Sequence, residues 1–294
     1  MKPAPFVYYA PASIEEAVAV LAQVAPDDGR VLAGGQTLVP AMAMRLARPS
    51  HLVDINGIPA LRRLSVIDGE LEIGACVRHA AFHDRVEGGP LGQLLATVVR
   101  HIAHLPIRSR GTFCGSVANA DPASEWCLAS ITLDATFIAR SVRGERRLKS
   151  GEFFLGYMST ALEADELLVA ARIPLLRDGT SFGFDEVSRR RGDFAQAMSL
   201  VTWTMTNGRL SSVRVGVGGV EASPRRLSEV ETILEGACVD DELLERAAQS
   251  AADLVEPTEG DVDAANYKRD LVRAVVRRAS AKARAMTSDP ARSV

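Results

Sequence analysis

Two short stretches of small and polar residues have the composition of a site for a phosphorylated cofactor. The first is the turn at residues 33–37, Ala-Gly-Gly-Gln-Thr. The second, residues 111–125, reads Gly-Thr-Phe-Cys-Gly-Ser-Val-Ala-Asn-Ala-Asp-Pro-Ala-Ser-Glu. Glycine lacks the Cβ that blocks close approach of the backbone, and successive free N–H groups can hold phosphate. We therefore expect both stretches to be loops that meet in space and hold one cofactor between them.

Two carboxylates belong to the second stretch. Asp121 and Glu125 could accept hydrogen bonds from ribose hydroxyls, as acidic residues do in other dinucleotide sites. They could also be solvated surface charges, and the turn at 33–37 taken alone could be an ordinary structural turn. The combination of glycines, small residues and acids favours a nucleotide cofactor.

Other motifs lack the spacing that their chemistry would need. Residues 215–219, Val-Gly-Val-Gly-Gly, are similar to a dinucleotide fingerprint, but a loop with a proline follows them where a helix is required. We predict a strand packed against another backbone there. The four cysteines form no Cys-x-x-Cys pair, and the five histidines form no His-Glu-x-x-His motif. We therefore expect no metal site in this chain, and we separately expect no proton-abstracting catalytic residue in it.

The elements that must position the first turn form a β-α-β-α-β pattern over residues 1–56. Strands are expected at 6–10, 30–33 and 51–55, and helices at 14–24 and 38–49. Ser13 and Glu16 have the spacing of a capping box at the start of the first helix. The glycine turn thus follows the carboxyl end of a strand, a common place for phosphate.

Residues 57–175 are expected to form a second, antiparallel-rich lobe. Residues 61–67 and 70–74 form a predicted hairpin through Asp68-Gly69. Helical patterns follow at 77–84 and 91–104, and strands are expected at 135–140, 146–148, 153–157 and 166–173. The second stretch lies in the middle of this lobe.

Residues 176–286 are expected to form a C-terminal domain. It contains a predicted strand at 181–188, a hairpin at 201–206 and 209–217 through Asn207-Gly208, and helices at 227–234, 241–251 and 267–286. Residues 287–294 are expected to be a flexible tail. The chain is therefore divided into two cofactor-binding lobes, 1–56 and 57–175, the domain 176–286 and the tail.

Composition excludes several classes of protein. A net charge of −3 gives no basic field for nucleic acid. No apolar run is long enough to span a membrane, and the N-terminus lacks the apolar core of a signal peptide. We expect a cytoplasmic protein with free thiols.

The two stretches, followed by Arg-Arg-Arg-Gly-Asp-Phe-Ala at 189–195, resemble the FAD-binding medium subunit of the molybdenum hydroxylases. This family includes carbon monoxide, xanthine and nicotine dehydrogenases. The resemblance extends from Tyr9 to about residue 285, with further support from Asp-Ile-Asn at 54–56 and Ile-Gly-Ala-Cys-Val-Arg-His at 73–79. It implies an α+β protein, with a two-lobed FAD-binding fold of the vanillyl-alcohol-oxidase (PCMH) type and a C-terminal α+β domain of helices and a small antiparallel sheet.

The resemblance also implies a role for individual residues. The residues that would wrap the FAD pyrophosphate are Val31, Leu32, Ala33, Gly34, Gly35, Gln36, Thr37 and Leu38. Those that would approach it from the middle lobe are Gly111, Thr112, Cys114, Gly115 and Ser116. Glu125 would bind the adenosine ribose with Asp121 close to the cofactor, Ile102 and Leu168 would line the cleft, and Phe194 would lie near the isoalloxazine.

By the same resemblance, this chain is the electron-transfer module of a heterotrimer. Molybdopterin would lie in a large subunit and 2Fe–2S clusters in a small one, the clusters would reduce FAD, and FAD would reduce an external acceptor. The assembly would be a dimer of heterotrimers. A self-contained flavin oxidoreductase and a cofactor-free assembly module are the alternatives.

Three positions depart from the family pattern. Cys114 stands where many members have glycine, so either its backbone tolerates a side chain or the loop has shifted. Gln36-Thr37 replaces His-Ser, and both residues can still donate hydrogen bonds. Asp185 or Glu186 replaces a lysine near the flavin, so we expect an acid there instead of a cation.

Overall fold

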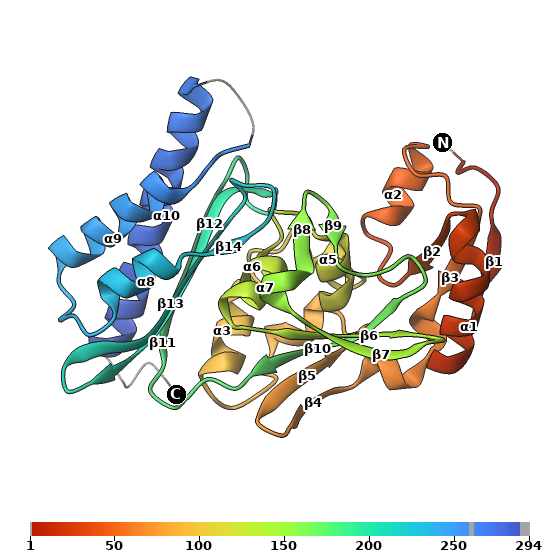
Figure 1. Cartoon of the computed structure of the whole chain (residues 1–294), viewed down its shortest axis with the longest axis horizontal. Coiled ribbons are helices and arrows are strands. Elements are labelled where there is room, and N and C mark those ends of the chain that lie inside the picture. The colour runs from red at the N-terminus through yellow and green to blue at the C-terminus, as the bar shows by residue number, and fades with distance from the viewer. Residues whose placement is uncertain (1, 259–261, 289–294) are drawn as a thin grey trace.

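Three larger β-sheets and one two-stranded sheet are found in the computed structural model, which describes residues 2–258 and 262–288. Figure 1 shows the N-terminal sheet at one end, the largest sheet in the middle, and the C-terminal sheet with its helices at the other end. Helices and mainly antiparallel strands confirm the predicted α+β class. The division at residues 56 and 175 stays a proposal, supported by the confinement of each sheet to one segment.

The N-terminal lobe is a parallel sheet in the order β1-β3-β2. Its elements are β1 (Val7–Tyr9), α1 (Ile14–Val24), η1 (Ala25–Asp27), β2 (Gly29–Leu32), α2 (Leu38–Ala43) and β3 (His51–Asp54). The Ser13 hydroxyl accepts the Glu16 N–H at 3.1 Å, which confirms the predicted cap of α1. Helix α2 ends earlier than predicted, because Arg45 adopts a left-handed φ of 61°. Since β2 and β3 are parallel, the segments after their carboxyl ends lie at one edge of the sheet.

The middle lobe contains an antiparallel sheet in the order β4-β5-β10-β6-β7. Its strands are β4 (Leu64–Ile67), β5 (Glu70–Gly74), β6 (Thr136–Ser141), β7 (Gly144–Lys149) and β10 (Leu167–Pro174), beside the two-stranded sheet of β8 (Phe154–Gly156) and β9 (Ser159–Thr160). Its helical elements are η2 (Ile55–Gly57), η3 (Pro59–Arg62), η4 (His79–His83), α3 (Pro90–Val98), α4 (Leu105–Arg108), α5 (Phe113–Asn119), α6 (Glu125–Thr132) and α7 (Ser150–Phe153). The Asp68-Gly69 turn has φ values of 51° and 77°, which confirms the predicted hairpin. The helix predicted at 77–84 is the short 3-10 helix η4, and the helix predicted at 91–104 ends at Val98 as α3.

The second cofactor stretch is helical where the sequence predicts a loop. Residues 113–119 form α5, and Glu125 begins α6. The Thr112 hydroxyl caps α5 by accepting the Gly115 N–H at 3.0 Å, and Ala120 ends it with a left-handed φ of 49°. A threonine cap followed by small residues suits a helix that packs close to other backbone.

The C-terminal domain places three helices on one face of an antiparallel sheet, while the middle lobe covers the other face (Figure 1). Its elements are β11 (Ser181–Ser188), β12 (Ala195–Thr206), β13 (Arg209–Gly218), β14 (Arg225–Arg226), α8 (Ser228–Leu234), α9 (Asp241–Leu254) and α10 (Val262–Ser288). Asn207 and Gly208 have φ values of 52° and 75°, which confirms the second predicted hairpin. Strand β12 alternates between two cores: Met198 and Leu200 pack with the lobes, and Val201 and Trp203 pack with the helices.

The predicted tail begins too early. Helix α10 continues to Ser288, and the Thr287 hydroxyl accepts a hydrogen bond from the Trp203 indole at 3.1 Å. Residues 289–294 lie outside the described residues. The helix lies close to β11, where a Cβ on Gly183 would come within 1.9 Å of the Ala279 carbonyl oxygen.

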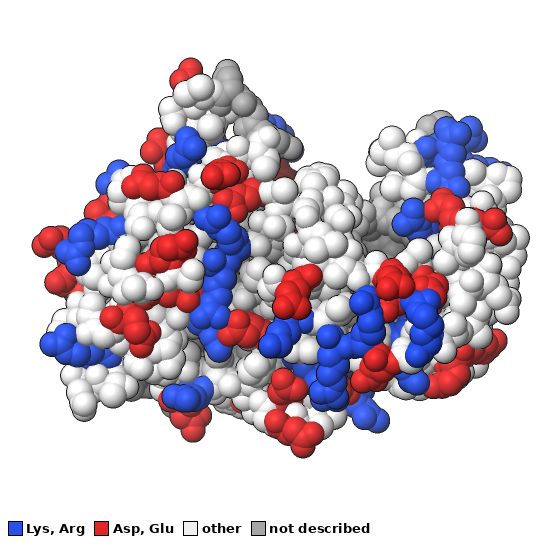
Figure 2. All heavy atoms as spheres, in the orientation of Figure 1, with Lys and Arg blue, Asp and Glu red and all other residues white. Residues whose placement is uncertain are grey.

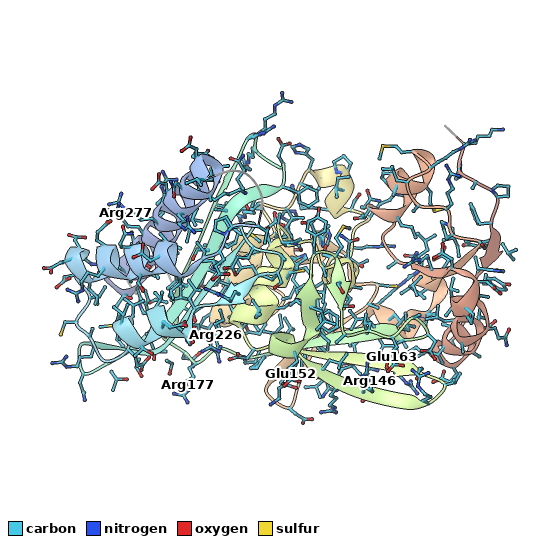
Figure 3. The ribbon with its side chains drawn as sticks, turned by 45° about the horizontal axis from the view of Figure 1, so that its top comes forward. Arg146, Glu152, Glu163, Arg177, Arg226 and Arg277 are labelled. Carbon is cyan, nitrogen blue, oxygen red and sulfur yellow. The ribbon has the colours of Figure 1, made fainter. Side chains whose placement is uncertain are left out.

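Ion pairs join the C-terminal domain to the middle lobe. Arg226 of β14, labelled in Figure 3, lies 2.6 Å from Asp134 of the middle lobe and 2.6 Å from Glu231 of α8. Arg214 of β13 also reaches Asp134, at 3.0 Å. No helix within residues 2–258 and 262–288 has the length and apolar character needed to cross a membrane.

Candidate cofactor-binding cleft

A cleft of about 820 Å³ lies between the N-terminal and middle lobes, with one end at the C-terminal domain. Figure 2 shows the molecule hollowed between the part that contains α2 and the part that contains β8 and β9. All of the residues predicted to contact the cofactor line this cleft, with the exception of Asp185. The structure therefore brings together residues that are far apart in the sequence, and their contact with FAD stays a prediction.

The two predicted stretches touch directly. A Cβ placed on Gly34 would lie 2.5 Å from the Arg110 carbonyl oxygen and 2.7 Å from the Gly111 Cα. Both of these atoms belong to the backbone, so only glycine allows this approach. The predicted meeting of the two stretches is confirmed.

The turn at residues 33–37 offers free backbone donors to the cleft. Within the described part of the chain, the N–H groups of Gly34, Gly35 and Gln36 have no hydrogen-bond acceptor. Gly35 has a φ of 71°, and the Gln36 side chain bonds back to the Gly34 carbonyl at 2.9 Å. Successive N–H groups around such a left-handed residue form a concave site for an anion.

Cys114 fits its position without a shift of the backbone. It lies within α5, where its backbone φ is negative, as in any α-helix. Its side chain points into the core, where the buried thiol donates to the Ile73 carbonyl at 3.4 Å. Burial raises the pKa of this thiol, so it stays neutral. Of the two alternatives for Cys114, the structure therefore shows a backbone that tolerates a side chain.

Glu125 is a buried acid at the floor of the cleft, with 7% of its surface exposed. Burial, followed by the negative charges of Glu186 and Asp121, raises the pKa of its carboxyl to about 8. Glu125 is thus mainly protonated at neutral pH. The Asp121 carboxylate accepts the Ala123 N–H at 2.9 Å and lines the cleft beside it.

Asp185 faces away from the cleft, which corrects the expectation that it lies near the flavin. Successive residues of β11 point to opposite faces of the sheet, and Asp185 points toward α10. Its carboxylate lies 2.6 Å from Lys282 and 3.7 Å from Arg278. Glu186, the next residue, points the other way and lies 3.2 Å from the His101 imidazole. Glu186 does not line the cleft, but its negative charge acts on Glu125, and its buried Oε2 has no hydrogen-bond partner among the described residues.

Phe194 stands at the end of the cleft with 68% of its surface exposed. The loop that carries it turns at Gly192, which has a φ of 88°. A Cβ there would lie 2.6 Å from the His104 ring, so the loop is pressed against the middle lobe. Ile102 and Leu168, both buried, contribute an apolar part of the wall of the cleft.

Sequence reasoning missed one wall of the cleft. It is formed by the segment around β8 and β9, with Met158, Ser159, Thr160, Leu162 and Glu163. Met158 has a left-handed φ of 50°, and its N–H bonds to the Ala120 carbonyl at 3.2 Å. The sequence offers no glycine or motif at Met158 that would indicate this turn.

His79 is a buried support of the second stretch. The Trp126 indole donates to the His79 Nδ1 at 2.9 Å, and the His79 main-chain N–H donates to the Gly111 carbonyl at 3.0 Å. Burial, followed by the charges of Arg108 and Arg78, lowers the pKa of the imidazole to about 4. His79 is therefore neutral at physiological pH.

We expect His79 to make the protein sensitive to acid. Its folded pKa lies below its ordinary value of 6.5, so stability present above pH 6.5 is lost as the pH falls toward 4. The free energy of unfolding of the apoprotein should fall by about 2 kcal/mol more than that of His79→Gln between pH 7 and pH 5. Glutamine does not titrate and can still accept from Trp126. Urea unfolding at both pH values measures the difference, and parallel losses would show that His79 titrates normally.

Comparisons with known families cover nearly the whole chain. Residues 4–176 match the FAD binding domain in molybdopterin dehydrogenase, and residues 182–283 match the CO dehydrogenase flavoprotein C-terminal domain.

Individual relatives match over their full length. The nicotine 6-hydroxylase medium subunit of Paenarthrobacter nicotinovorans is 35% identical over 280 residues, with 95% of this chain and 98% of the relative covered. The carbon monoxide dehydrogenase medium chain of Hydrogenophaga pseudoflava is 33% identical, with 95% and 97% covered. Chains in the solved structures of that organism's carbon monoxide dehydrogenase and of quinoline 2-oxidoreductase from Pseudomonas putida 86 both superpose with a TM-score of 0.89 at 34% identity. The first alignment covers 97% of this chain and 99% of the other, and the second covers 98% and 99%.

Proposed function

The chain belongs to the family of FAD-binding medium subunits of molybdenum hydroxylases, and on that basis we propose that it passes electrons through FAD from 2Fe–2S clusters to an external acceptor. It is thus one subunit of an oxidoreductase. Bound FAD would supply the redox chemistry. The protein's task would be to hold the cofactor and to set the charge around it.

The observation that supports this proposal most strongly is the contact between Gly34 and the backbone at residues 110–111. It creates a narrow cradle in which the free N–H groups of residues 34–36 face the cleft. A diphosphate needs such a cradle, because its charge is distributed over several oxygens that seek donors. The residues present therefore fit the cofactor of the family.

We propose the following roles along the cleft. Residues 31–38 and 111–116 would hold the pyrophosphate. Glu125 would bind the adenosine ribose, and Phe194 would lie against the isoalloxazine ring. Because Glu125 is neutral at physiological pH, it could both donate and accept hydrogen bonds there without adding charge beside a diphosphate.

We further propose that the chain assembles with two kinds of partner, a molybdopterin-binding large subunit and a small subunit with 2Fe–2S clusters, as a dimer of heterotrimers. The relatives named as medium subunits or medium chains support the existence of partners. A cytoplasmic location is also proposed, in keeping with four free cysteines, three of them buried.

The visible absorption spectrum of the purified full-length chain tests the cofactor assignment. We expect a yellow protein, or an apoprotein that takes up one FAD per chain and gains a flavin spectrum. A colourless chain that cannot be reconstituted would contradict the proposal and favour a cofactor-free assembly module. A flavin-containing chain that turns over a substrate without any partner would favour a self-contained oxidoreductase.

A further inference from the structure

Behind the cleft, two side chains join the glycine turn to the middle lobe in a closed ring of contacts. The Asn56 side chain donates from Nδ2 to the Ala33 carbonyl at 2.7 Å. Its Oδ1 accepts from the Arg78 guanidinium at 2.6 Å, and the same guanidinium donates to the Arg110 carbonyl. The Arg110 carbonyl in turn packs against Gly34, the residue after Ala33. The ring thus returns to the turn where it began.

The backbone reinforces the half of the ring in the middle lobe. Arg78 and Thr112 form an antiparallel bridge, flanked by a bond from the Phe113 N–H to the Val77 carbonyl at 3.1 Å. Arg78 is therefore held to the second stretch by its main chain and reaches the N-terminal lobe with its side chain. Neither Asn56 nor Arg78 lines the cleft.

A second set of contacts fixes the orientation of the Asn56 amide. Asp54 Oδ1 accepts from Asn56 Nδ2 at 2.6 Å and from the Asn56 N–H at 2.9 Å. The Tyr8 hydroxyl donates to the other oxygen of Asp54 at 2.6 Å. Because Nδ2 faces only oxygens, the Leu32 and Ala33 carbonyls and Asp54 Oδ1, and Oδ1 faces a guanidinium, only one amide orientation satisfies the network.

We propose that Asn56 and Arg78 are positioning residues that set the separation of the two cofactor stretches, and so determine how tightly the protein binds the diphosphate of its nucleotide cofactor. This inference rests on the proposed function, in which that cofactor is FAD. Asn56 is suited to the role because an amide donates on one side and accepts on the other. Arg78 is suited because its planar fork serves two acceptors, the Asn56 amide and the Arg110 carbonyl. The ammonium of a lysine is a compact point charge without this fixed fork geometry.

Calorimetric titration of the full-length apoprotein with FAD and with ADP tests the inference. We expect Asn56→Ala and Arg78→Lys each to weaken the binding of FAD about tenfold, the usual effect of one lost hydrogen-bonded link. The double variant should also lose only about tenfold, because both residues belong to one ring. ADP should lose affinity by the same factor as FAD, since the ring acts on the diphosphate that both ligands share.

Arg62→Lys is the matched control. Arg62 donates to the Asn56 main-chain carbonyl at 2.5 Å and, among the described residues, forms no hydrogen bond or ion pair with the second stretch. This variant should therefore bind FAD within twofold of the wild type. The midpoint of urea unfolding of each apoprotein separates an effect on positioning from an effect on general stability. Asn56→Asp is a second variant at the same position. It should weaken binding even if Asn56→Ala proves too unstable to test, because a carboxylate cannot donate a hydrogen bond to the Ala33 carbonyl.

Several results would overturn the inference. Unchanged affinity in the ring variants would show that the ring does not control the cradle, and a hundredfold loss in the double variant would show two independent contacts. Loss of FAD affinity with unchanged ADP affinity would place the effect away from the diphosphate. A wild-type chain that binds ADP but not FAD would instead contradict the proposed function. In that case the change in ADP affinity of the ring variants would still test the inference.

Discussion

Gly34→Ala is expected to weaken the binding of FAD about a hundredfold. The added methyl group would lie 2.5 Å from the Arg110 carbonyl oxygen and 2.7 Å from the Gly111 Cα, and neither backbone atom can move without displacing the second cofactor stretch. A misplacement of about 1 Å can cost an active site about a hundredfold in rate, and we expect a loss of the same order in the binding of FAD here. We therefore expect the dissociation constant for FAD to rise by roughly that factor, measured by titration of the apoprotein with FAD.

Gly88→Ala is the control for this variant. A Cβ at Gly88 meets no atom within 4 Å, so the same substitution there should leave FAD binding unchanged. The two variants differ only in what surrounds the added methyl group. Wild-type affinity in Gly34→Ala would mean that the two stretches can separate without loss of the site, and the cradle would then not hold the diphosphate.

Replacement of Glu125 is expected to change how stability and binding depend on pH. The folded pKa of about 8 lies above the ordinary value of 4.5, so the apoprotein loses stability as the pH rises from 4.5 to 8. Glu125→Gln removes this titration, and its stability should exceed that of the wild type by an amount that grows by roughly 3 to 4 kcal/mol between pH 5 and pH 8. Urea unfolding of both apoproteins at the two pH values gives this number.

The same residue should make FAD binding weaker above pH 8. Ionised Glu125 would then stand beside Glu186 and Asp121 and would add negative charge to a cleft that holds a diphosphate. Glu125→Gln should bind FAD with little pH dependence in this range, whereas Glu125→Ala should bind it more weakly at every pH while remaining folded. If Glu125→Ala retains FAD as well as the wild type does, Glu125 does not bind the ribose.

The sequence predicted the elements that depend on local chemistry. The Asp-Gly and Asn-Gly turns require left-handed conformations that few residue pairs adopt, and Ser13 with Glu16 indicates a helix start without ambiguity. The meeting of the stretches at 33–37 and 111–125 was predicted from their composition, and it occurs where Gly34 approaches the backbone of residues 110–111.

Other features depended on packing that no local pattern encodes. The small residues of 113–119 suit a loop or a closely packed helix equally, and the Thr112 cap decides for the helix only once the chain is folded. The sequence could not tell which of Asp185 and Glu186 points toward the middle lobe. That depends on which face of β11 packs against α10, and only the folded structure fixes it. The wall around Met158 is formed by a turn whose sequence is not typical of one.

Strand β12 has a consequence for modularity. The two matched family domains are separated between residues 176 and 182. Strand β12 nevertheless belongs to both cores, because Met198 and Leu200 pack with the lobes while Val201 and Trp203 pack with the C-terminal helices. The Gly219 N–H also bonds to the Pro122 carbonyl at 2.9 Å, next to Asp121. The two regions therefore cannot be separated or exchanged as independent domains. A cut near residue 180 would expose to solvent an apolar face that lies beneath the cleft.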